Sequence, residues 1–295
     1  MSRRYTQKFK GDEFNVYRAL RSINPSPYLF FFDYGDFKIF GSSPEAQIVI
    51  NNKKAEIHPI AGTFKRTGDD QKDQMTAKEL AKDPKENCEH IMLVDLDRND
   101  LSRSGNNVKV EKSREIQFYS HVIHLVSKVT AQIKEDIKSY QVVEDTFPAG
   151  TLSGAPKHKA LELIEKYEKV NRNFYGGAIG FIDFKGNFNH AIIIRSFFSK
   201  NNILNYQAGA GIVIDSKPEK ELEEVKNKLG ALEMTKVTIT YSSIPETAKR
   251  VGISPAHYYR EMNKGNLPRG TKIGGRRVVA DSEVDAILQG GDNSE

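Results

Sequence analysis

The strongest constraint on the fold is a series of short β-rich runs separated by Gly, Asn and Asp turns. These runs are Tyr28–Phe32, Phe37–Phe40, Ala46–Ile50, Ala178–Ile182, Ala191–Phe198 and Asn205–Gln207. Three helical stretches interrupt them, at Gln71–Arg103 (divided near Pro84), Ala155–Tyr167 and Pro218–Met234. Many strands with few, long helices favour an α+β fold of layered, mostly antiparallel sheets with outer helices over a doubly wound parallel sheet.

The length of 295 residues allows about two domains. The character of the chain changes after Met234, where short helical segments and Gly-rich turns replace the β-rich pattern. We therefore expect one domain over residues 1–236 and a second over residues 237–295.

The second domain has the outline of a helix-turn-helix. Pro245–Val251 is amphipathic, Gly252-Ile253 forms a tight turn, and Ser254-Pro255 starts a second helix that runs through Asn263. Thr271–Val279 is typical of a small hairpin that turns at its two central glycines. We expect a small helical domain with a wing.

Composition excludes several classes of protein. Hydrophobic residues make up 38% of the chain and charged residues 28%, as in a globular protein with a sizeable core. The sequence has no apolar run long enough to cross a membrane and no signal peptide, so we expect no membrane contact. A lone Cys88 rules out an internal disulfide and fits the cytoplasm. The net charge of +5 is spread along the chain and by itself indicates no nucleic-acid partner.

Two helices carry carboxylates beside their apolar stripes. On the first, the carboxylates are those of Glu86 and Glu89; on the other, Glu221 and Glu224 lie close to Lys228. Paired carboxylates at the edge of a core are suited to a hard cation such as Mg²⁺, which prefers oxygen ligands. The alternative is that Glu86–His90 and Glu224–Lys228 are ordinary surface pairs one helical turn apart. Spacing alone leaves both readings open.

Other polar residues in apolar surroundings are candidate anion-binding groups. Arg195 lies inside an apolar run and needs an anion, which is either a ligand or a structural partner such as Asp183. The segment Gly209-Ala210-Gly211 either directs main-chain N–H groups at an anion or forms a tight bend. His121 and His124 are either core histidines or catalytic groups.

Taken together, these segments resemble chorismate-utilising enzymes, most closely anthranilate synthase component I. The matching motifs are Asn24–Tyr28, Gly41–Glu45, Pro59–Thr63, Glu86–Arg103, Ser120–Ser127, Phe147–Lys157, Tyr175–Ala178, Ile194-Arg195, Gln207–Val213 and Asp215–Lys228. They follow the family's order over about residues 3–236, and their combination is highly specific. The resemblance covers the family's catalytic half, so we expect its N-terminal half to be absent.

The resemblance implies a role for each matching site residue. Glu89 and Glu224 are the expected principal Mg²⁺ ligands, with Glu86 and Glu221 close by. Glu45 is the expected general acid for departure of the C4 hydroxyl of chorismate, beside His124 and Thr151. The expected substrate-binding residues are Gly62, Thr63, Tyr175, Arg195, Gly209, Gly211 and Lys228.

The implied reaction begins with addition of ammonia at C2 of chorismate. The C4 hydroxyl then leaves, and elimination of pyruvate produces anthranilate. A glutamine amidotransferase subunit is the expected source of the ammonia. Ala61 supports this product, because related aminodeoxychorismate synthases usually carry a lysine there. Asn24, Pro25, Ser26, Pro27 and Tyr28 are the expected remnant of a tryptophan feedback site.

The tail resembles small excisionase-like or AlpA-like DNA-binding proteins. The expected DNA-contacting residues are His257, Tyr258, Arg260, Arg276 and Arg277. A winged domain that binds protein is the alternative. For the whole chain, the competing hypothesis to an anthranilate-forming lyase is a DNA-binding regulator whose enzyme-derived part is inert, and a third is a nonfunctional truncated fusion.

Overall fold

The computed structural model describes residues 1–118, 122–214, 216–234, 241–273, 276–280 and 284. The chain divides into two compact units. The first contains Met1–Lys8 and Pro25–Gly230, and the second contains Phe9–Asn24 and Ala231–Glu295. No helix within the described residues combines the length and the apolar character needed to cross a membrane.

The first unit contains a five-stranded antiparallel sheet in the order β1-β12-β11-β3-β2. Its strands are β1 (Ser2–Lys8), β2 (Tyr28–Asp33), β3 (Lys38–Ser43), β11 (Ser196–Lys200) and β12 (Ile203–Gly209). Strand β1 pairs with β12 along its whole length, so the two ends of the unit's sequence meet in one sheet.

The larger sheet of this unit has seven antiparallel strands in the order β6-β8-β5-β4-β10-β9, with β7 also paired to β8. Its strands are β4 (Ala46–Asn51), β5 (Lys54–Ile57), β6 (Ile60–Lys65), β7 (Gly105–Phe118), β8 (Val122–Ile133), β9 (Ala178–Ile182) and β10 (Phe188–Ile192). Strands β5 and β6 pair with successive parts of β8, and His58-Pro59 lies between them. Strands β5 and β6 thus run one after the other alongside β8, and the pairing is interrupted at the proline, which has no N–H to donate.

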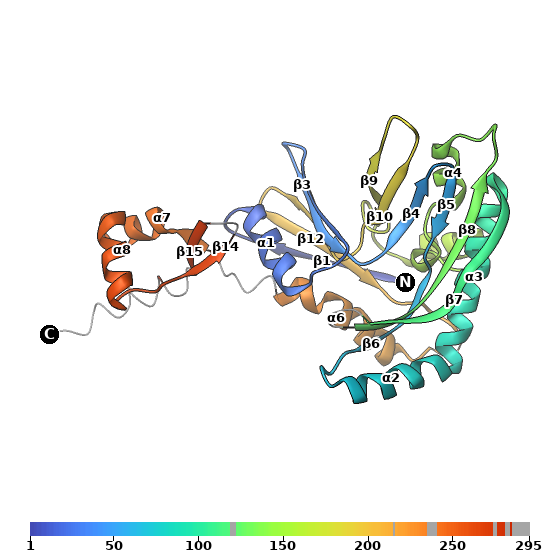
Figure 1. Ribbon diagram of the computed structural model, residues 1–295, viewed down its shortest axis with the longest axis horizontal. Coiled ribbons are helices and arrows are strands. Elements are labelled where there is room, and N and C mark those ends of the chain that lie inside the picture. The colour runs from blue at the N-terminus through green and yellow to red at the C-terminus, as the bar shows by residue number, and fades with distance from the viewer. Residues whose placement is uncertain (119–121, 215, 235–240, 274–275, 281–283, 285–295) are drawn as a thin grey trace. The chain divides into compact units, whose positions relative to one another are not determined.

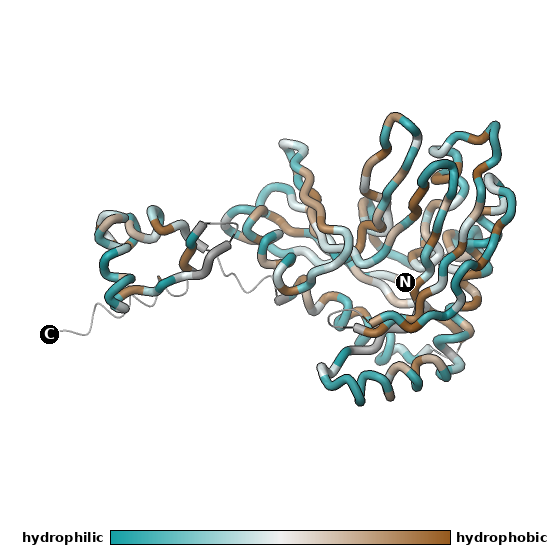
Figure 2. The backbone as a smooth tube through the Cα atoms, viewed as in Figure 1, coloured by the Kyte–Doolittle hydropathy of each residue, from teal (hydrophilic) through white to brown (hydrophobic). Residues whose placement is uncertain are grey.

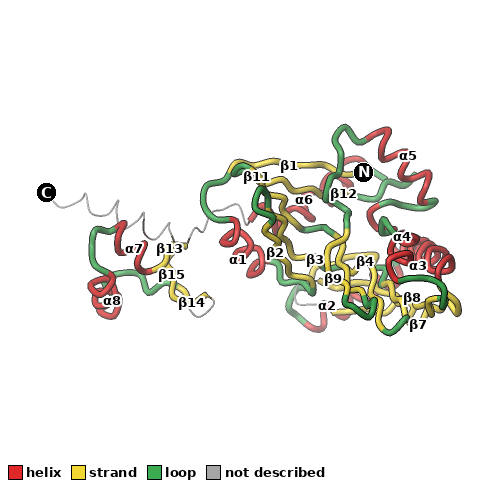
Figure 3. Tube along the Cα trace, turned by 90° about the horizontal axis from the view of Figure 1, so that it is seen from above, coloured by secondary structure: helices red, strands yellow, loops and turns green. Residues whose placement is uncertain are grey.

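Helices cover the large sheet, as Figures 1 and 3 show for the helices beside β7 and β8. They are α2 (Asp70–Lys82), α3 (Pro84–Ser104) and α4 (Ser139–Thr146). The other helical elements are α5 (Lys157–Tyr167), α6 (Pro218–Met234), whose last turn belongs to the second unit, and a short 3₁₀ helix η1 (Gly150–Leu152). Helix α3 packs on α4, β7 and β8. The core between them is formed by Ile48, Ile50, Ala55, Ile57, Leu101, Val129, Ala131, Ile133, Val142 and Phe188. Figure 2 shows hydrophobic and hydrophilic segments on the strands and helices of this unit.

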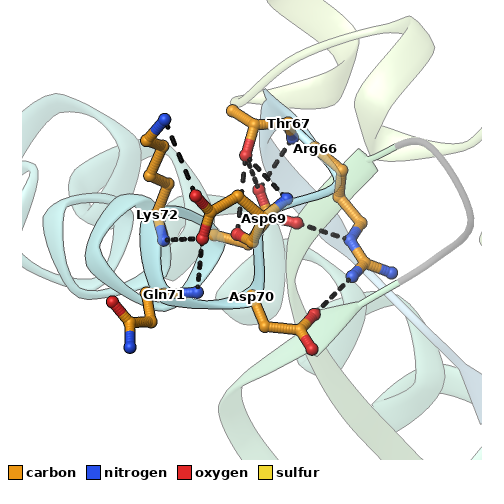
Figure 4. Close-up of polar contacts among 7 residues, drawn as sticks. Arg66, Thr67, Asp69, Asp70, Gln71 and Lys72 are labelled. Atoms are coloured by element: carbon orange, nitrogen blue, oxygen red, sulfur yellow. Dashed lines mark hydrogen bonds and ion pairs between the residues drawn. The ribbon is translucent and has the colours of Figure 1, made fainter.

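Helix α2 begins at a dense polar network (Figure 4). The carboxylate of Asp69 caps the helix by accepting from the main-chain N–H groups of Gln71 and Lys72. The buried carboxylate of Asp73 accepts from Arg66 Nε at 2.8 Å and from Thr67 N at 2.7 Å. These hydrogen bonds, led by that of Arg66, lower the pKa of Asp73 to about 2.

The second unit contains three helices and a small antiparallel sheet in the order β13-β15-β14. Its elements are α1 (Glu13–Ile23), β13 (Tyr241–Ser243), α7 (Ile244–Arg250), α8 (Pro255–Lys264), β14 (Thr271–Ile273) and β15 (Arg276–Ala280). Gly252, with φ 76°, makes the turn between α7 and α8, and Ser254 caps α8. The core of this unit is formed by Ile244, Ala248, Tyr258, Met262, Val279 and Val284.

Most of the predicted elements are present within a few residues of their predicted bounds. The predicted continuous strand Ala191–Phe198 is wrong, because the chain breaks into β10 and β11 where Arg195 adopts a left-handed φ of 50°. Strands β7 and β8 were not predicted. The pattern of β7 is mostly polar because much of this edge strand is exposed, so it lacks the alternation that marks a half-buried strand.

Candidate active site

The candidate site forms where the chain crosses twice between the two sheets of the first unit. The first crossover, at Pro44-Glu45, joins β3 of the small sheet to β4 of the large one. The second, at Ile193–Arg195, joins β10 of the large sheet to β11 of the small one. Because β3 pairs with β11 and β4 with β10, the two crossovers lie side by side. Ile192 N donates to Glu45 O at 3.0 Å, and Ser42 N donates to Arg195 O at 3.1 Å.

Glu45 is a partly buried acid at the first crossover. Its carboxylate accepts from the hydroxyl of Thr151, in η1, with an Oγ1–Oε1 distance of 2.9 Å. Burial raises the pKa of Glu45 to about 7, although the Thr151 hydrogen bond and the charge of Lys228 act in the opposite direction. A carboxyl with this pKa exists in both protonation states near neutral pH, as a general acid requires.

Arg195 lies at the second crossover with its guanidinium desolvated. Burial lowers the pKa of Arg195, and the neighbouring Tyr175 acts in the opposite direction. No ion pair joins Arg195 to a carboxylate of the described residues. Asp183, the structural partner considered above, instead accepts hydrogen bonds from its own turn, at Lys185 and Asn187. This arrangement favours an external anion as the partner of Arg195.

Tyr175 is held against the second crossover by main-chain hydrogen bonds. Gly176 N donates to Ile193 O at 3.0 Å, and Ile193 N donates to Gly177 O at 2.8 Å. Burial raises the pKa of Tyr175 to about 12, so the phenol stays protonated and can donate a hydrogen bond. The structure thus brings together Arg195 and Tyr175, two of the predicted carboxylate-binding residues.

The end of β12 brings further predicted residues to the site. Lys228 Nζ, from α6, donates to Gly209 O at 3.0 Å and pairs with Glu224 Oε1 at 2.5 Å. A Cβ on Gly209 would lie 2.6 Å from Met1 O, so glycine is required by the close approach of β1. A Cβ on Gly211 would lie 3.6 Å from Glu89 Oε1, which places the α3 carboxylate beside this glycine.

The predicted metal ligands have the right chemistry but do not form a ligand cluster. Their oxygen donors suit Mg²⁺. Within the described residues, however, no group of three or more His, Cys, Asp or Glu side chains is arranged to hold an ion. Glu224 makes the helical pair with Lys228 considered above, whereas His90 is buried with its Nε2 2.6 Å from Ser127 Oγ. Glu221 is buried on α6, and Glu86 lies in the first turn of α3.

The remaining predicted residues lie in several elements. His124, buried in β8, is paired in register with Thr63 of β6, next to a bulge that contains Gly62. The side chains of residues 61–65 are outside the described part, as is His121. In the Asn24–Tyr28 segment, Asn24 caps α1 and Tyr28 begins β2, and burial raises the pKa of Tyr28.

The predicted DNA-contact residues are not equally accessible. The contact predicted for Tyr258 is wrong, because this side chain is fully buried and its hydroxyl donates to Pro268 O at 3.3 Å. Tyr258 of α8 is part of the core of the second unit. His257 and Arg260 are exposed on the same helix. Arg277 donates to Arg269 O at 2.7 Å, and the side chain of Arg276 is outside the described part.

The sequence did not single out three charged residues of the helices near the first crossover, of which Asp97 lines one small cavity with Glu45. They are Asp97 and Asp100 of α3 and Lys157 of α5. The two aspartates are buried, and Lys157 Nζ lies 2.5 Å from Asp100 Oδ2. Leu93 and Leu96 precede the two aspartates by one turn on α3, so extending the helical wheel by one more turn would have revealed Asp97 and Asp100.

Comparison with protein families identifies this part of the chain. A family model described as a chorismate binding enzyme matches residues 1–234. The chain belongs to the chorismate-binding enzyme family. The match covers all elements that form the two crossovers, and it stops at the C-terminal end of α6.

Individual members of the chorismate-binding family agree in sequence and in fold. Anthranilate synthase component 1 of Aquifex aeolicus is 45% identical over 234 residues, which are 79% of this chain and 47% of the relative. The protein of the same name from Bacillus subtilis is 46% identical over 234 residues, 79% of this chain and 45% of the relative. The crystal structure of anthranilate synthase component I from Streptococcus pneumoniae has a TM-score of 0.73 at 40% identity and covers 80% of this chain and 52% of that one. The chain thus spans about half the length of the curated relatives it matches.

Proposed function

We propose that the first unit is the chorismate-converting part of an anthranilate synthase, which forms anthranilate and pyruvate from chorismate and ammonia. The observation that carries this proposal is the pair of adjacent crossovers, which brings a protonatable Glu45 and a desolvated Arg195 to one junction. The identity of 45% to an anthranilate synthase component 1 supports the choice of product. Ala61, which has no nucleophilic group, is consistent with ammonia as the attacking nucleophile.

In this proposal the contacts of each site residue determine its role in binding or converting chorismate. Arg195 and Tyr175 bind the enolpyruvyl carboxylate of chorismate, because Arg195 has a cation that no carboxylate of the described residues pairs with, and Tyr175 has a protonated phenol. Glu45 donates its proton to the departing C4 hydroxyl, and Thr151 orients the Glu45 carboxyl. Lys228, held by Gly209 O, adds positive charge beside the substrate.

Mg²⁺ is part of the proposal, with Glu89, Glu224, Glu86 and Glu221 as its ligands. When bound, the metal would neutralise the ring carboxylate of chorismate. Because these carboxylates do not form a ligand cluster here, the metal site needs its own test. Isothermal titration calorimetry with Mg²⁺ should show binding to the wild type and none to Glu89→Gln.

The decisive experiment follows the fluorescence of anthranilate with chorismate, Mg²⁺ and an ammonium salt. We expect turnover by the full chain and at least a hundredfold loss in Glu45→Gln, since general acid catalysis contributes about 10²–10⁴. Asp95→Asn is the matched control, because Asp95 is exposed on α3 and, among the described residues, pairs with Arg98 of its own helix alone. Absence of product from a folded wild-type preparation would refute the proposal. Activity with glutamine only after a glutamine amidotransferase is added would support that protein as partner.

We propose as a second function that the second unit binds duplex DNA. Two short helices joined by a glycine turn pack on one core with a small antiparallel sheet, and the exposed side of the second helix carries His257 and Arg260. Fluorescence anisotropy of the full chain with labelled duplexes should show weaker binding by Arg260→Ala than by Lys159→Ala, a control in the first unit. If Arg260 contacts a phosphate, Arg260→Ala should also reduce the slope of log K against log salt by about one. Equal binding by both variants would argue against DNA as the ligand.

A further inference from the structure

A buried acidic residue lines the same cavity as Glu45. This small cavity is lined by Glu45 and Thr151, by Gln47 of β4 and by Asp97 of α3. The side chain of Asp97 is only 6% exposed. Asp97 makes no hydrogen bond or ion pair with the described residues. A carboxylate in such a position would be desolvated without compensation.

The nearby cation is committed to a different aspartate. Lys157 Nζ lies 2.5 Å from Asp100 Oδ2 and also donates to Thr146 O at 2.9 Å. One lysine therefore acts on two carboxyl groups, those of Asp100 and Asp97. Since the charge of Asp100 is compensated by direct contact with Lys157, a proton is the simplest compensation for Asp97.

Two unsatisfied acceptors indicate that a donor is needed here. Asp100 Oδ1 and Gln47 Oε1 are buried and have no hydrogen-bond partner in the described part of the chain. Buried polar atoms without partners are rare, and each lost hydrogen bond costs about 1–3 kcal/mol. A protonated Asp97 adds an O–H donor to a region in which acceptors outnumber donors.

The electrostatics of the region agree with this geometry. Burial raises the pKa of Asp97 well above its ordinary value, the charges of Asp100 and Glu45 raise it further, and Lys157 opposes them. Around these groups, Arg103 and Asp145 act on Asp100, and Lys228 acts on Glu45.

We propose that Asp97 is a proton-holding positioning residue that returns a proton to Glu45 after each turnover. This inference rests on the proposed function, in which Glu45 gives its proton to the C4 hydroxyl and the hydroxyl leaves as water. The O–H bond of Asp97 then breaks and an O–H bond forms on Glu45. The Asp97 carboxylate regains its proton from solvent before the next cycle.

The protonated state of Asp97 is tested without any turnover, by infrared spectroscopy of the full chain at pH 8. At this pH Glu45, whose pKa is about 7, is mostly ionised. The spectrum should contain the carbonyl band of a protonated carboxyl that is absent from Asp97→Asn and retained in Asp95→Asn. If the wild type lacks this band, the inference is overturned, even if neither variant folds.

The return of the proton is tested by kinetics. Asp97→Asn should lower kcat about tenfold or more, within the range for proton transfer by a side chain, with KM unchanged. Formate should restore part of the kcat of Asp97→Ala, because it supplies a small acid in the space left by the side chain. An unchanged kcat in Asp97→Asn, or no rescue by formate, would overturn the role. A wild type without turnover but with the infrared band refutes the proposed function and leaves the protonation of Asp97 standing.

Discussion

Replacement of Glu45 by glutamine should stabilise the protein at high pH. The pKa of Glu45 rises from 4.5 to about 7 on burial. Each pKa unit corresponds to about 1.36 kcal/mol, so ionising Glu45 in the folded protein costs about 3 kcal/mol more than in the unfolded chain. Below pH 4.5 both states are protonated and the effect vanishes. Between pH 4.5 and 7 the unfolded chain loses its proton first, so the stability of the wild type falls as pH rises.

Glu45→Gln keeps the shape of the side chain but has no proton to lose. Urea denaturation of both proteins from pH 4 to pH 8 measures the difference in their free energies of unfolding. This difference should move in favour of the variant by about 3 kcal/mol across the range. Glu165→Gln removes an exposed carboxylate of α5 and should change the free energy of unfolding by less than about 0.5 kcal/mol at every pH. A difference between Glu45→Gln and wild type that is independent of pH would refute the argument from burial.

Two further predictions concern the packing behind Glu45. Lys157→Met should lower the free energy of unfolding by about 3–5 kcal/mol, because it leaves buried Asp100 unpaired. Lys159→Met, which removes an exposed pair with Glu162, should cost less than about 1 kcal/mol, and an equal loss in both would contradict this prediction. Gly150→Ala should cost about 1–3 kcal/mol, because its Cβ would lie 2.7 Å from Leu96 Cδ2. Gly230→Ala has open space around its Cβ and should instead stabilise α6 by up to about 1 kcal/mol, as thermal denaturation can show.

The sequence predicted those elements whose pattern is formed by residues close together along the chain. Helix α6 begins and ends at its predicted residues, because its apolar stripe and Pro218 are local features. Strand β7 was missed, because its polar residues follow from the exposure of an edge strand. Arg195 was placed in a strand, but its left-handed φ results from the crossover in which it lies. The C-terminal boundary of the family match, residue 234, lies close to the predicted one at residue 236.

For the candidate site, the sequence supplied the chemical groups but not their environment. It selected Glu45 and Tyr175 from a resemblance, Arg195 from its apolar surroundings, and the paired glutamates from helical spacing. It did not identify Asp97, because only tertiary packing places this carboxyl in the wall of the cavity that Glu45 also lines. Burial also excludes Tyr258 as a DNA contact, because its side chain belongs to the core of the second unit.

The sequence by itself thus determined the type of most elements and the inventory of acids, amides and cations, whereas the assignment of Phe9–Asn24 to the second unit followed only from tertiary contacts. Only the tertiary structure decided that crossovers about 150 residues apart lie side by side, since strand pairing brings Glu45 against Ile192 and Ser42 against Arg195. It also decided which carboxyl groups keep their protons. The physical reason is that helical and strand periodicity act between near neighbours, whereas desolvation depends on every segment that packs around a group.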